Sequence, residues 1–388
     1  MKNVVLRAPV LTQSGYGVHA RQVARWLLGR TDVKLSVNAL PWGDTAWLLD
    51  RTSHDGLIGA LMDRTSVPSD LRGTDSMSVQ LQLPNEWDPN VADVNVGMSA
   101  VVETDRCSPE WVAACNKMTR VIVPSKHAEA CLRASGTITT PIVVVPEAYG
   151  DAFVPGVPQA TLPELDAPTN VLLFGQLTGA NPHSDRKNLF FAVKWLCELL
   201  RDRADVGIVL KTNMGRNTLI DRDIVVNMMK GLLTEVRRGP NPRLTLLHGD
   251  MSDAEVSALY RHPQIAMLAA PTRGEGFGLP ILEAAAAGLP VVATGWSGHM
   301  DFLQGHGIGH VDYKLVDVHP SRVDGKIFLK GARWAEPNEV DFKQRITRVL
   351  NESAVHRAEA AQLAQVVQRS HSFAAVAKSY DAALGDLL

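Results

Sequence analysis

The sequence predicts an α/β protein made of two Rossmann-like domains, each with a parallel sheet, that face each other across a cleft. Patterns typical of buried strands alternate with helical patterns along most of the chain. The length of 388 residues favours two domains. A proline-rich segment at 154–168 interrupts the alternation, which then restarts, as expected for a linker.

The first half of the chain begins with a strand and a helix. An apolar run predicts the strand Val4–Val10, and apolar residues at helical spacing predict a helix over Val18–Gly29. Ser108 and Ser125 are expected to cap two later helices. At 41–90 no regular pattern is present, and we expect only loops and short helices. The other elements expected here are strands at 34–40, 94–102, 120–123 and 142–145 and helices at 109–118 and 126–134.

The second half repeats this organisation. The predicted domains are residues 1–155 and 169–370, joined by a linker at 156–168 and followed by a C-terminal helix within 371–388. Open parallel sheets bind ligands at the carboxyl ends of their strands, so we expect the site in the cleft. The elements expected are strands at 170–175, 206–211, 244–248, 265–270 and 291–294 and helices at 188–200, 218–237, 253–261 and 280–287.

Composition and charge exclude several classes of protein. Hydrophobic residues make up 45% and charged residues 21% of the chain, which is typical of a globular protein. No apolar run reaches the ~18 residues of a membrane-spanning helix, and the start lacks a signal peptide, so we expect a soluble, cytoplasmic protein. The net charge of −2 is not the basic excess of a dedicated nucleic-acid binder. The four cysteines form no CxxC pair and predict neither a zinc site nor a disulfide framework.

A glycine-rich turn followed by a helix start carries the clearest chemical pattern. Pro280 suits the first turn of a helix, where the free backbone amides and the helix dipole form an anion site. Gly276 and Gly278 would let a phosphate approach the backbone closely. Glu275 and Glu283 flank this site, and each could accept hydrogen bonds from hydroxyls attached to the phosphate, such as a ribose diol and a sugar.

The segment GEGFGLPILEAAAAGLPVVAT resembles the signature of the family 4 retaining glycosyltransferases of the GT-B fold, whose E-x₇-E pair corresponds to Glu275 and Glu283. The resemblance implies transfer of a sugar from a nucleotide diphosphate-sugar, with UDP- and GDP-sugars favoured, to a hydroxyl acceptor with retention of configuration. It also implies that no metal or other cofactor is needed and that the last helix crosses back to the first domain. It extends to the segments 103–111, 121–125, 174–188, 248–260 and 372–380.

The resemblance also implies roles for single residues. Glu283 would bind the nucleotide ribose, and Glu275 would contact the donor sugar. Lys187 matches the lysine that neutralises the diphosphate. The backbone of the glycine-rich turn would meet the diphosphate or sugar at Gly276, Phe277, Gly278 and Leu279.

One position departs from the family pattern. The family usually has an arginine where this chain has Gln176. Arg186, next to Lys187, is the expected substitute, and Lys211 and Arg216 are weaker candidates. A cation beside a leaving diphosphate would stabilise the negative charge that develops as the glycosidic bond breaks.

In the first domain, a Gly-rich loop and two carboxylates are candidates for the site. Gly15, Tyr16 and Gly17 follow the first strand, where the family has a loop against the donor phosphates, although an ordinary turn has the same pattern. Glu103 and Asp105 follow a later strand and would orient the acceptor or assist as a general base, although a loop with a helix cap also explains them.

The acceptor stays open between a saccharide, a small molecule and modified DNA. A soluble acceptor is favoured, because the helix at 18–29 carries only Arg21 and Arg25 as basic residues and gives no strong membrane signal. The segment 296–302 is also similar to bacteriophage glycosyltransferases, some of which modify hydroxymethylated DNA bases. The lack of a basic excess counts against DNA.

Two further classes of function stay in competition. One is a nucleotide-sugar 2-epimerase of the same fold, which needs no acceptor and lacks this form of the E-x₇-E loop. The other is a non-catalytic sugar-nucleotide binder, which only the departure at Gln176 supports.

Asp221 and Asp223 form a DxD pattern in a helical segment, without the strand context of a metal motif. P-loop, HExxH and GxSxG motifs are absent from the sequence.

Overall fold

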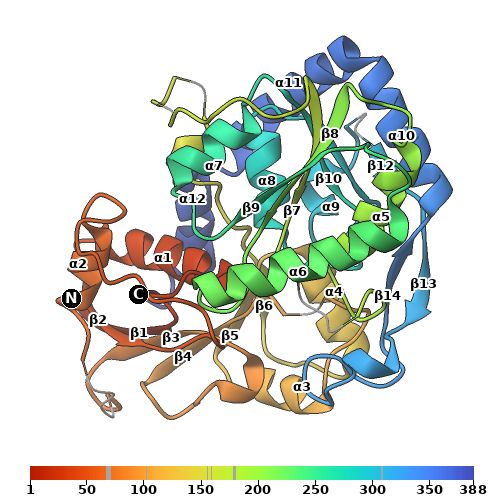
Figure 1. Ribbon diagram of the computed structural model, residues 1–388. Helices are drawn as coiled ribbons and strands as arrows, with labels where there is room; N and C mark the ends of the chain where they lie inside the picture. Colours follow the sequence, from red (N-terminus) through yellow and green to blue (C-terminus); the bar gives the residue numbers. More distant parts are fainter. Residues whose placement is uncertain (67–70, 102, 155, 159, 178–180, 307–308) are drawn as a thin grey trace. The chain divides into compact units, whose positions relative to one another are not determined.

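The computed structural model describes residues 1–66, 71–101, 103–154, 156–158, 160–177, 181–306 and 309–388. It divides into two compact units (Figure 1), one formed by Met1–Ala148 with Phe373–Leu388 and the other by Tyr149–Ser372. Each unit has its own six-stranded sheet. The fold class predicted from the sequence, α/β with two Rossmann-like domains, is confirmed.

The sheet of the first unit has the strand order β2-β1-β3-β4-β5-β6, and all of its neighbouring strands are parallel. Its strands are β1 (Lys2–Ala8), β2 (Val33–Ala39), β3 (Ser76–Leu81), β4 (Val94–Met98), β5 (Arg120–Val123) and β6 (Ile142–Val144). Its helices are α1 (Gly15–Leu28), α2 (Leu57–Met62), α3 (Pro109–Cys115), α4 (Lys126–Ser135) and α12 (Phe373–Leu384). The strand predicted at 94–102 corresponds to β4, and its predicted last residue, 102, lies outside the described residues.

Strand β3 corrects the prediction that 41–90 holds only loops and short helices. It lies between β1 and β4 in the sheet, although its sequence SMSVQL contains three polar residues. Those polar side chains are buried and hydrogen-bonded, as Ser78 Oγ donates to Asn95 Oδ1 at 2.7 Å and Gln80 Nε2 donates to the carbonyl of Asp88 at 2.6 Å. Satisfied polar groups replace the apolar run on which the sequence prediction relied.

The C-terminal helix α12 belongs to the first unit and packs on α1. The Tyr380 hydroxyl and His19 Nε2 lie 2.9 Å apart, and Trp26 Nε1 donates a hydrogen bond to Asp381 at 2.9 Å. The rings of Trp26 and Tyr380 also stack, with 5.2 Å between their centroids. The core of the first unit is therefore completed by the last segment of the chain.

The second unit has a parallel sheet in the order β12-β11-β10-β7-β8-β9. Its strands are β7 (Thr169–Phe174), β8 (Val206–Thr212), β9 (Leu244–His248), β10 (Ile265–Ala270), β11 (Val291–Thr294) and β12 (Gly309–Val311). Its helices are α5 (Leu189–Leu199), α6 (Leu219–Val236), α7 (Asp253–Tyr260), α8 (Leu279–Ala286), α9 (Met300–Leu303), α10 (Glu339–Asn351) and α11 (Ser353–Ser370).

The boundary between the units differs from the predicted one. The first segment of unit one ends at Ala148, before the predicted end at 155, which lies outside the described residues. The described part of the predicted linker 156–168 belongs to the second unit. Gln264 holds it there, because its Nε2 donates to the carbonyls of Leu165 and Ala167 and its Oε1 accepts from the Leu165 amide at 2.9 Å.

An antiparallel hairpin that the sequence did not predict follows the second sheet. It pairs β13 (Tyr313–Asp317) with β14 (Arg333–Pro337). The strands are short and pack on a small apolar cluster, so no long periodic pattern marks the hairpin in the sequence. The buried residues of this cluster are Val318, Phe328, Ala332 and Trp334.

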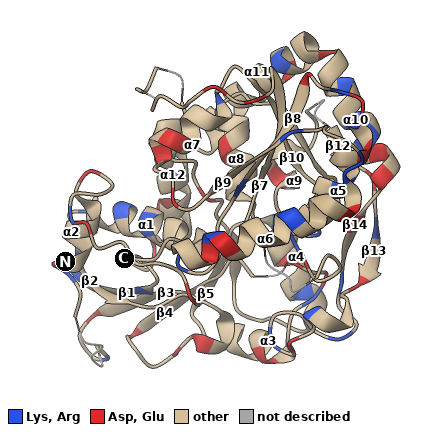
Figure 2. Cartoon of the chain, viewed as in Figure 1, with Lys and Arg blue, Asp and Glu red and all other residues tan. Residues whose placement is uncertain are grey.

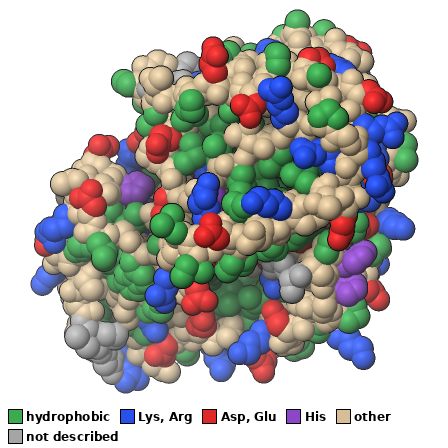
Figure 3. Space-filling model, viewed as in Figure 1, with side chains coloured by type: hydrophobic (Ala, Val, Ile, Leu, Met, Phe, Trp, Pro, Cys, Tyr) green, Lys and Arg blue, Asp and Glu red, His purple; other side chains and the backbone are tan. Residues whose placement is uncertain are grey.

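Basic and acidic residues are interspersed along the helices (Figure 2). On the face that Figure 3 shows, basic and acidic side chains likewise lie among one another. Among the described residues, no helix is both long and apolar enough to cross a membrane.

Gly17→Ala is expected to destabilise the first unit, because the added Cβ would lie 2.1 Å from the carbonyl oxygen of Thr12. Overpacking of this kind costs about 1–3 kcal/mol of unfolding free energy. Gly15→Ala is the matched control, since no atom lies within 4 Å of its added Cβ. Urea unfolding followed by circular dichroism measures both variants. Equal unfolding midpoints would contradict a packing requirement for Gly17.

Candidate active site

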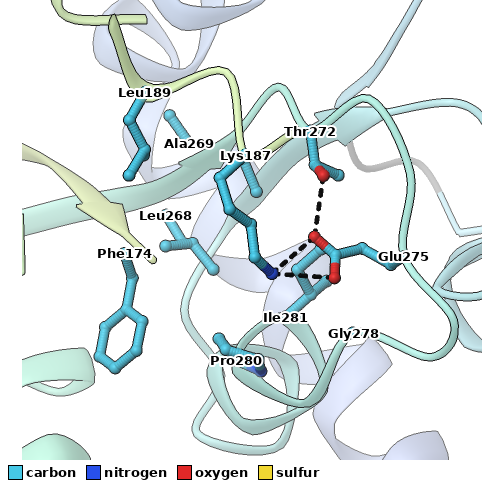
Figure 4. A pocket seen from close by; sticks show the side chains of 11 residues that line it. Phe174, Lys187, Leu189, Leu268, Ala269, Thr272, Glu275, Gly278, Pro280 and Ile281 are labelled. Atoms are coloured by element: carbon cyan, nitrogen blue, oxygen red, sulfur yellow. Dashed lines mark hydrogen bonds and ion pairs between the residues drawn. The ribbon is translucent and has the colours of Figure 1, made fainter. Parts of the chain in front are cut away.

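A small pocket lies at the carboxyl edge of the second sheet (Figure 4). Phe174 ends β7, Thr272 follows β10, and Pro280 belongs to the first turn of α8. Lys187 reaches the same place from the segment before α5. This is the edge at which ligands bind to open parallel sheets. The lining residues include Phe174, Lys187, Leu189, Leu268, Thr272, Glu275, Gly278, Pro280 and Ile281.

The carboxylate of Glu275 is the centre of the pocket's polar contacts. Lys187 Nζ lies 2.8 Å from both of its oxygens, and Arg186 Nη1 lies 3.1 Å from Oε2. The Thr272 hydroxyl donates to Oε1 at 2.8 Å. Figure 4 shows Lys187 and Thr272 converging on this carboxylate. The structure therefore brings together three of the residues that the sequence selected, Glu275, Lys187 and Arg186.

These contacts decide the charge of Glu275. Burial on its own would raise the pKa of this carboxyl group. The charges of Lys187 and Arg186 and the hydrogen bonds from Lys187 and Thr272 outweigh burial and lower the pKa to about 2. Glu275 is thus a buried anion held by two cations.

The glycine-rich turn is fixed by close packing against the segment after β11. Gly278 has φ +102°, a left-handed conformation that favours glycine. A Cβ on Gly298 would lie 2.2 Å from the Gly276 carbonyl oxygen, so the two backbones approach too closely for any other residue. The Gly298 amide donates to the Glu275 carbonyl, and the Glu275 amide donates to Ser297 Oγ, both at 2.9 Å.

Phe277 and His299 have packing roles beside this turn. Phe277 is buried, and its ring lies 5.4 Å from that of Phe302. His299 is fully buried and donates through Nε2 to the Thr294 carbonyl at 2.7 Å. Burial also lowers the pKa of His299, which favours the neutral ring. The side chains of both residues thus support the turn.

Glu283 lies one turn into α8, on the side of Tyr260. Tyr260 is buried, and its ring centroid lies 5.8 Å from that of Phe174 in the pocket. Burial and then the negative charge of Glu283 raise the pKa of the Tyr260 hydroxyl. Glu283 and Glu275 therefore lie on either side of the start of α8, as the seven-residue spacing predicted.

Lys211 is buried on β8 beside the pocket residue Phe174. Its Nζ donates to the Gly249 carbonyl at 2.6 Å and lies 5.6 Å from the Phe174 ring centroid. Burial lowers its pKa, and the charge of Asp250 opposes this shift. Gln176 and Arg216 are exposed. Of the two weaker candidates for the missing cation, Lys211 is thus the buried one, and it lies beside the pocket residue Phe174.

In the first unit, helix α1 begins at Gly15 rather than at the predicted Val18, because Ser14 caps it by accepting from the Gly17 amide. The predicted loop is thus the first turn of the helix. The hydroxyl of Tyr16 lies 2.9 Å from Ser99 Oγ, and its ring stacks on Trp42 at 3.8 Å. Burial raises the pKa of this phenol.

The two carboxylates chosen in the first unit have different surroundings. Glu103 is close enough to α1 that its charge adds to the effect of burial in raising the pKa of Tyr16. Asp105 lies 3.4 Å from Arg106 Nε, and its charge adds to the effect of burial in raising the pKa of Cys131. Asp221 of the DxD pattern belongs to the capping box of α6, where it accepts hydrogen bonds from the amide and hydroxyl of Thr218.

Three site residues were not selected from the sequence. Thr272 donates to the Glu275 carboxylate, and Ser297 accepts from the Glu275 amide. The third is Arg273, whose side chain bonds the Asp185 carbonyl and the Glu336 carboxylate. Ser297 has φ +88°, which no sequence pattern reveals. Arg273 could have been noticed as a charged residue between an apolar strand, which ends at Ala270, and the glycine-rich turn.

Glu275→Gln is expected to lower the free energy of unfolding at pH 7 by about 3 kcal/mol, because the folded pKa of about 2 lies below its ordinary value of 4.5. A depressed pKa stabilises the fold above pH 4.5, and this contribution is lost as the pH falls toward 2. The difference between the wild type and the variant should therefore shrink in acid.

Urea unfolding at about pH 7 and about pH 3 measures this difference. The control is Glu235→Gln, which removes an exposed glutamate of α6. A Glu275→Gln effect that is no larger than the control at pH 7 would rule out the ion cluster as a source of stability.

Comparisons with known proteins agree with this fold. A model of the family described as "Family 4 Glycosyltransferase in conflict systems" matches residues 141–380, more than half of the chain. A comparison with curated protein sequences gave no match.

Several solved structures are similar over the whole chain. Sucrose-phosphate synthase from Thermosynechococcus elongatus is 14% identical with a TM-score of 0.65, over 100% of this chain and 99% of that one. The Anabaena protein Alr3699/HepE, solved with UDP-glucose, is 13% identical with a TM-score of 0.60, over 100% of each chain. α,α-Trehalose 6-phosphate synthase from Burkholderia multivorans is 10% identical with a TM-score of 0.60, over 100% and 98%. The chain has the GT-B fold and belongs to the family 4 glycosyltransferases of conflict systems.

Proposed function

We propose that this glycosyltransferase moves a sugar from a nucleotide diphosphate-sugar to a hydroxyl acceptor with retention of configuration and without a metal ion or other cofactor. The observation that carries the proposal is the buried Glu275 carboxylate with Lys187 and Arg186, directly before the glycine-rich start of α8. UDP- and GDP-sugars are the favoured donors, and the Anabaena relative was solved with UDP-glucose.

The diphosphate would lie at the start of α8. Pro280 lacks an amide hydrogen, but the amides of Gly278 and Leu279 and the helix dipole favour an anion there. Lys187 and Arg186 would supply the positive charge, with Lys211 at the neighbouring strand end. This charge stabilises the leaving diphosphate as the glycosidic bond breaks.

The two glutamates would orient the rest of the donor. Glu283 accepts hydrogen bonds from the ribose hydroxyls, and Glu275 accepts from the sugar. A carboxylate whose pKa is about 2 stays an acceptor at neutral pH. The proton of the acceptor hydroxyl passes to the departing phosphate oxygen, so the chain contributes positioning and electrostatics.

The first unit would supply the acceptor side. The start of α1 at Gly15, Tyr16 and Gly17 would face the donor phosphates, and Glu103 and Asp105 would orient the acceptor. We favour a saccharide or small molecule as the acceptor, because positive and negative side chains are interspersed and the net charge is −2. DNA with hydroxymethylated bases is the competing outcome of the acceptor assay.

Donor binding is the first test. UDP, GDP, ADP and their common sugar conjugates are each added to the purified chain, and the thermal unfolding midpoint is followed. A ligand at ~100 times its Kd adds roughly 2.7 kcal/mol of stability, so one nucleotide series should raise the midpoint clearly. If none of these compounds raises it, the proposal fails at its first step.

Transfer is tested next with the donor so identified, labelled in its sugar. Label should appear in a saccharide or small-molecule product whose anomeric proton coupling shows retention. Incubation with the donor alone separates a transferase from a 2-epimerase, because only the epimerase converts the donor sugar. Label that appears only in hydroxymethylated DNA would replace the favoured acceptor class.

Glu283→Ala and Lys187→Met are expected to affect different parts of the donor. Without the ribose contact, Glu283→Ala should weaken binding of the nucleoside diphosphate by about tenfold and leave binding of inorganic pyrophosphate unchanged. Lys187→Met should weaken both ligands by a similar factor. Isothermal titration calorimetry measures both affinities. Equal loss of pyrophosphate binding in the two variants would contradict the assignment of Glu283 to the ribose.

A further inference from the structure

Arg273 is a buried arginine that does not contact Glu275 through its side chain. It is only 1% exposed. Its Nη1 donates to the carbonyls of Pro182 at 2.9 Å and Asp185 at 2.7 Å. Its Nε and Nη2 donate to the two carboxylate oxygens of Glu336, at 2.9 and 3.1 Å. The guanidinium thus joins two segments that are far apart in the sequence.

The first of these segments carries the donor-site cations. Besides the two carbonyls held by the Arg273 side chain, the Arg273 amide donates to the Arg186 carbonyl at 2.8 Å. Arg273 therefore bonds the backbone of 182–186 at three carbonyls, immediately before Lys187. This segment is irregular, and no sheet or helix hydrogen bonds fix its carbonyls.

The second segment is the β13–β14 hairpin. Glu336 lies on β14, and the neighbouring Ala335 amide donates to the Arg273 carbonyl at 3.0 Å. The Arg273 guanidinium also lies 5.4 Å from the ring centroid of Trp334. Outside the strands, Asn181 Nδ2 donates to Ser321 Oγ at 3.0 Å. The hairpin thus holds the segment 182–187 through Arg273, and the Asn181–Ser321 hydrogen bond adds a second contact next to it.

We propose that Arg273 is a positioning residue for donor binding, which holds Arg186 and Lys187 against the diphosphate site and is itself held by Glu336. This inference rests on the proposed function, because the cations matter only if the site binds a diphosphate. A guanidinium is suited to the task, since its planar fork bonds a carboxylate on one side and carbonyls on the other. Lysine cannot make this set of bonds at once.

A purely structural role for Arg273 is the competing explanation. A buried charge that loses its partner destabilises a protein whether or not a site is nearby. The two explanations differ in which ligand they affect. Misplaced cations weaken binding of a diphosphate but spare the nucleoside, whereas a loosened second unit weakens both.

The experiment uses the full chain with Arg273→Met, Arg273→Lys and Glu336→Gln. The probes are the nucleoside diphosphate found by thermal unfolding and the corresponding nucleoside, titrated calorimetrically well below the unfolding midpoint. Arg120→Met is the matched control, because Arg120 also forms a two-point ion pair with a carboxylate, Asp386, and bonds a main-chain carbonyl, in the first unit.

Arg273→Met should weaken diphosphate binding by about tenfold or more and leave nucleoside binding within about twofold, since small displacements of positioning groups have effects of this size. Arg273→Lys and Glu336→Gln should show smaller losses in the same direction, and Arg120→Met none. If Arg273→Met does not fold, the other two variants decide by the same comparison.

Diphosphate affinity that stays within about twofold of the wild type overturns the inference, and so does an equal loss for both ligands. A wild-type chain that binds no nucleoside diphosphate refutes the proposed function itself, which is a different result from normal wild-type binding with unaffected variants.

Discussion

The ion cluster at Glu275 is the interaction on which the second unit's pocket depends. A buried carboxylate is costly unless cations and hydrogen-bond donors surround it. Lys187, Arg186 and Thr272 meet that requirement from two segments of the chain. The glutamate therefore fixes where these segments lie, and they in turn keep it ionised. The charges that hold the turn are also those that the proposed reaction uses.

Two glycines have a packing role at the turn before α8, Gly278 of the signature and Gly298 after β11. Gly278 turns the chain into α8 with a positive φ, and Gly298 lets the segment after β11 contact the Gly276 carbonyl. These two features place Glu275 before the helix and Glu283 within it. The E-x₇-E spacing is thus the separation that this turn and one helical turn produce.

Much of the fold could be predicted from the sequence, because parallel strands buried on both faces are continuous apolar runs. The prediction missed β3, whose buried Ser78 and Gln80 find partners on other segments. Partners of this kind come from tertiary structure, which a local pattern cannot reveal. The hairpin β13–β14 was missed for a related reason, since its strands are short and rest on a small cluster.

The same distinction applies to the site. Glu275 and Lys187 were selected through a motif, and the structure shows that they are in contact, which the motif did not predict. Thr272 and Ser297 were missed because only the folded turn brings them to Glu275. Roles in ligand binding stay predictions for all of these residues, including Glu283 and the first-unit residues.

The departure at Gln176 has a local structural answer. Gln176 is exposed, whereas Arg186, the neighbour of Lys187, contacts Glu275, and its replacement of the family arginine stays a prediction. Adjacent side chains of an extended chain point in opposite directions, so a straight segment could not direct both at one carboxylate. Here the chain turns.

The turn at this segment is made by Asp185 and Asn188. Asp185 is fully buried and accepts from the Lys187 amide at 3.2 Å and the Leu189 amide at 2.7 Å, while Asn188 has φ +57°. Asp favours such turns because its side chain bonds the backbone just ahead, and Asn tolerates the positive φ that Asn188 adopts. The paired cations therefore depend on turn chemistry beside them as much as on the residues themselves. In this chain the turn thus lets two adjacent cations reach the one carboxylate of Glu275.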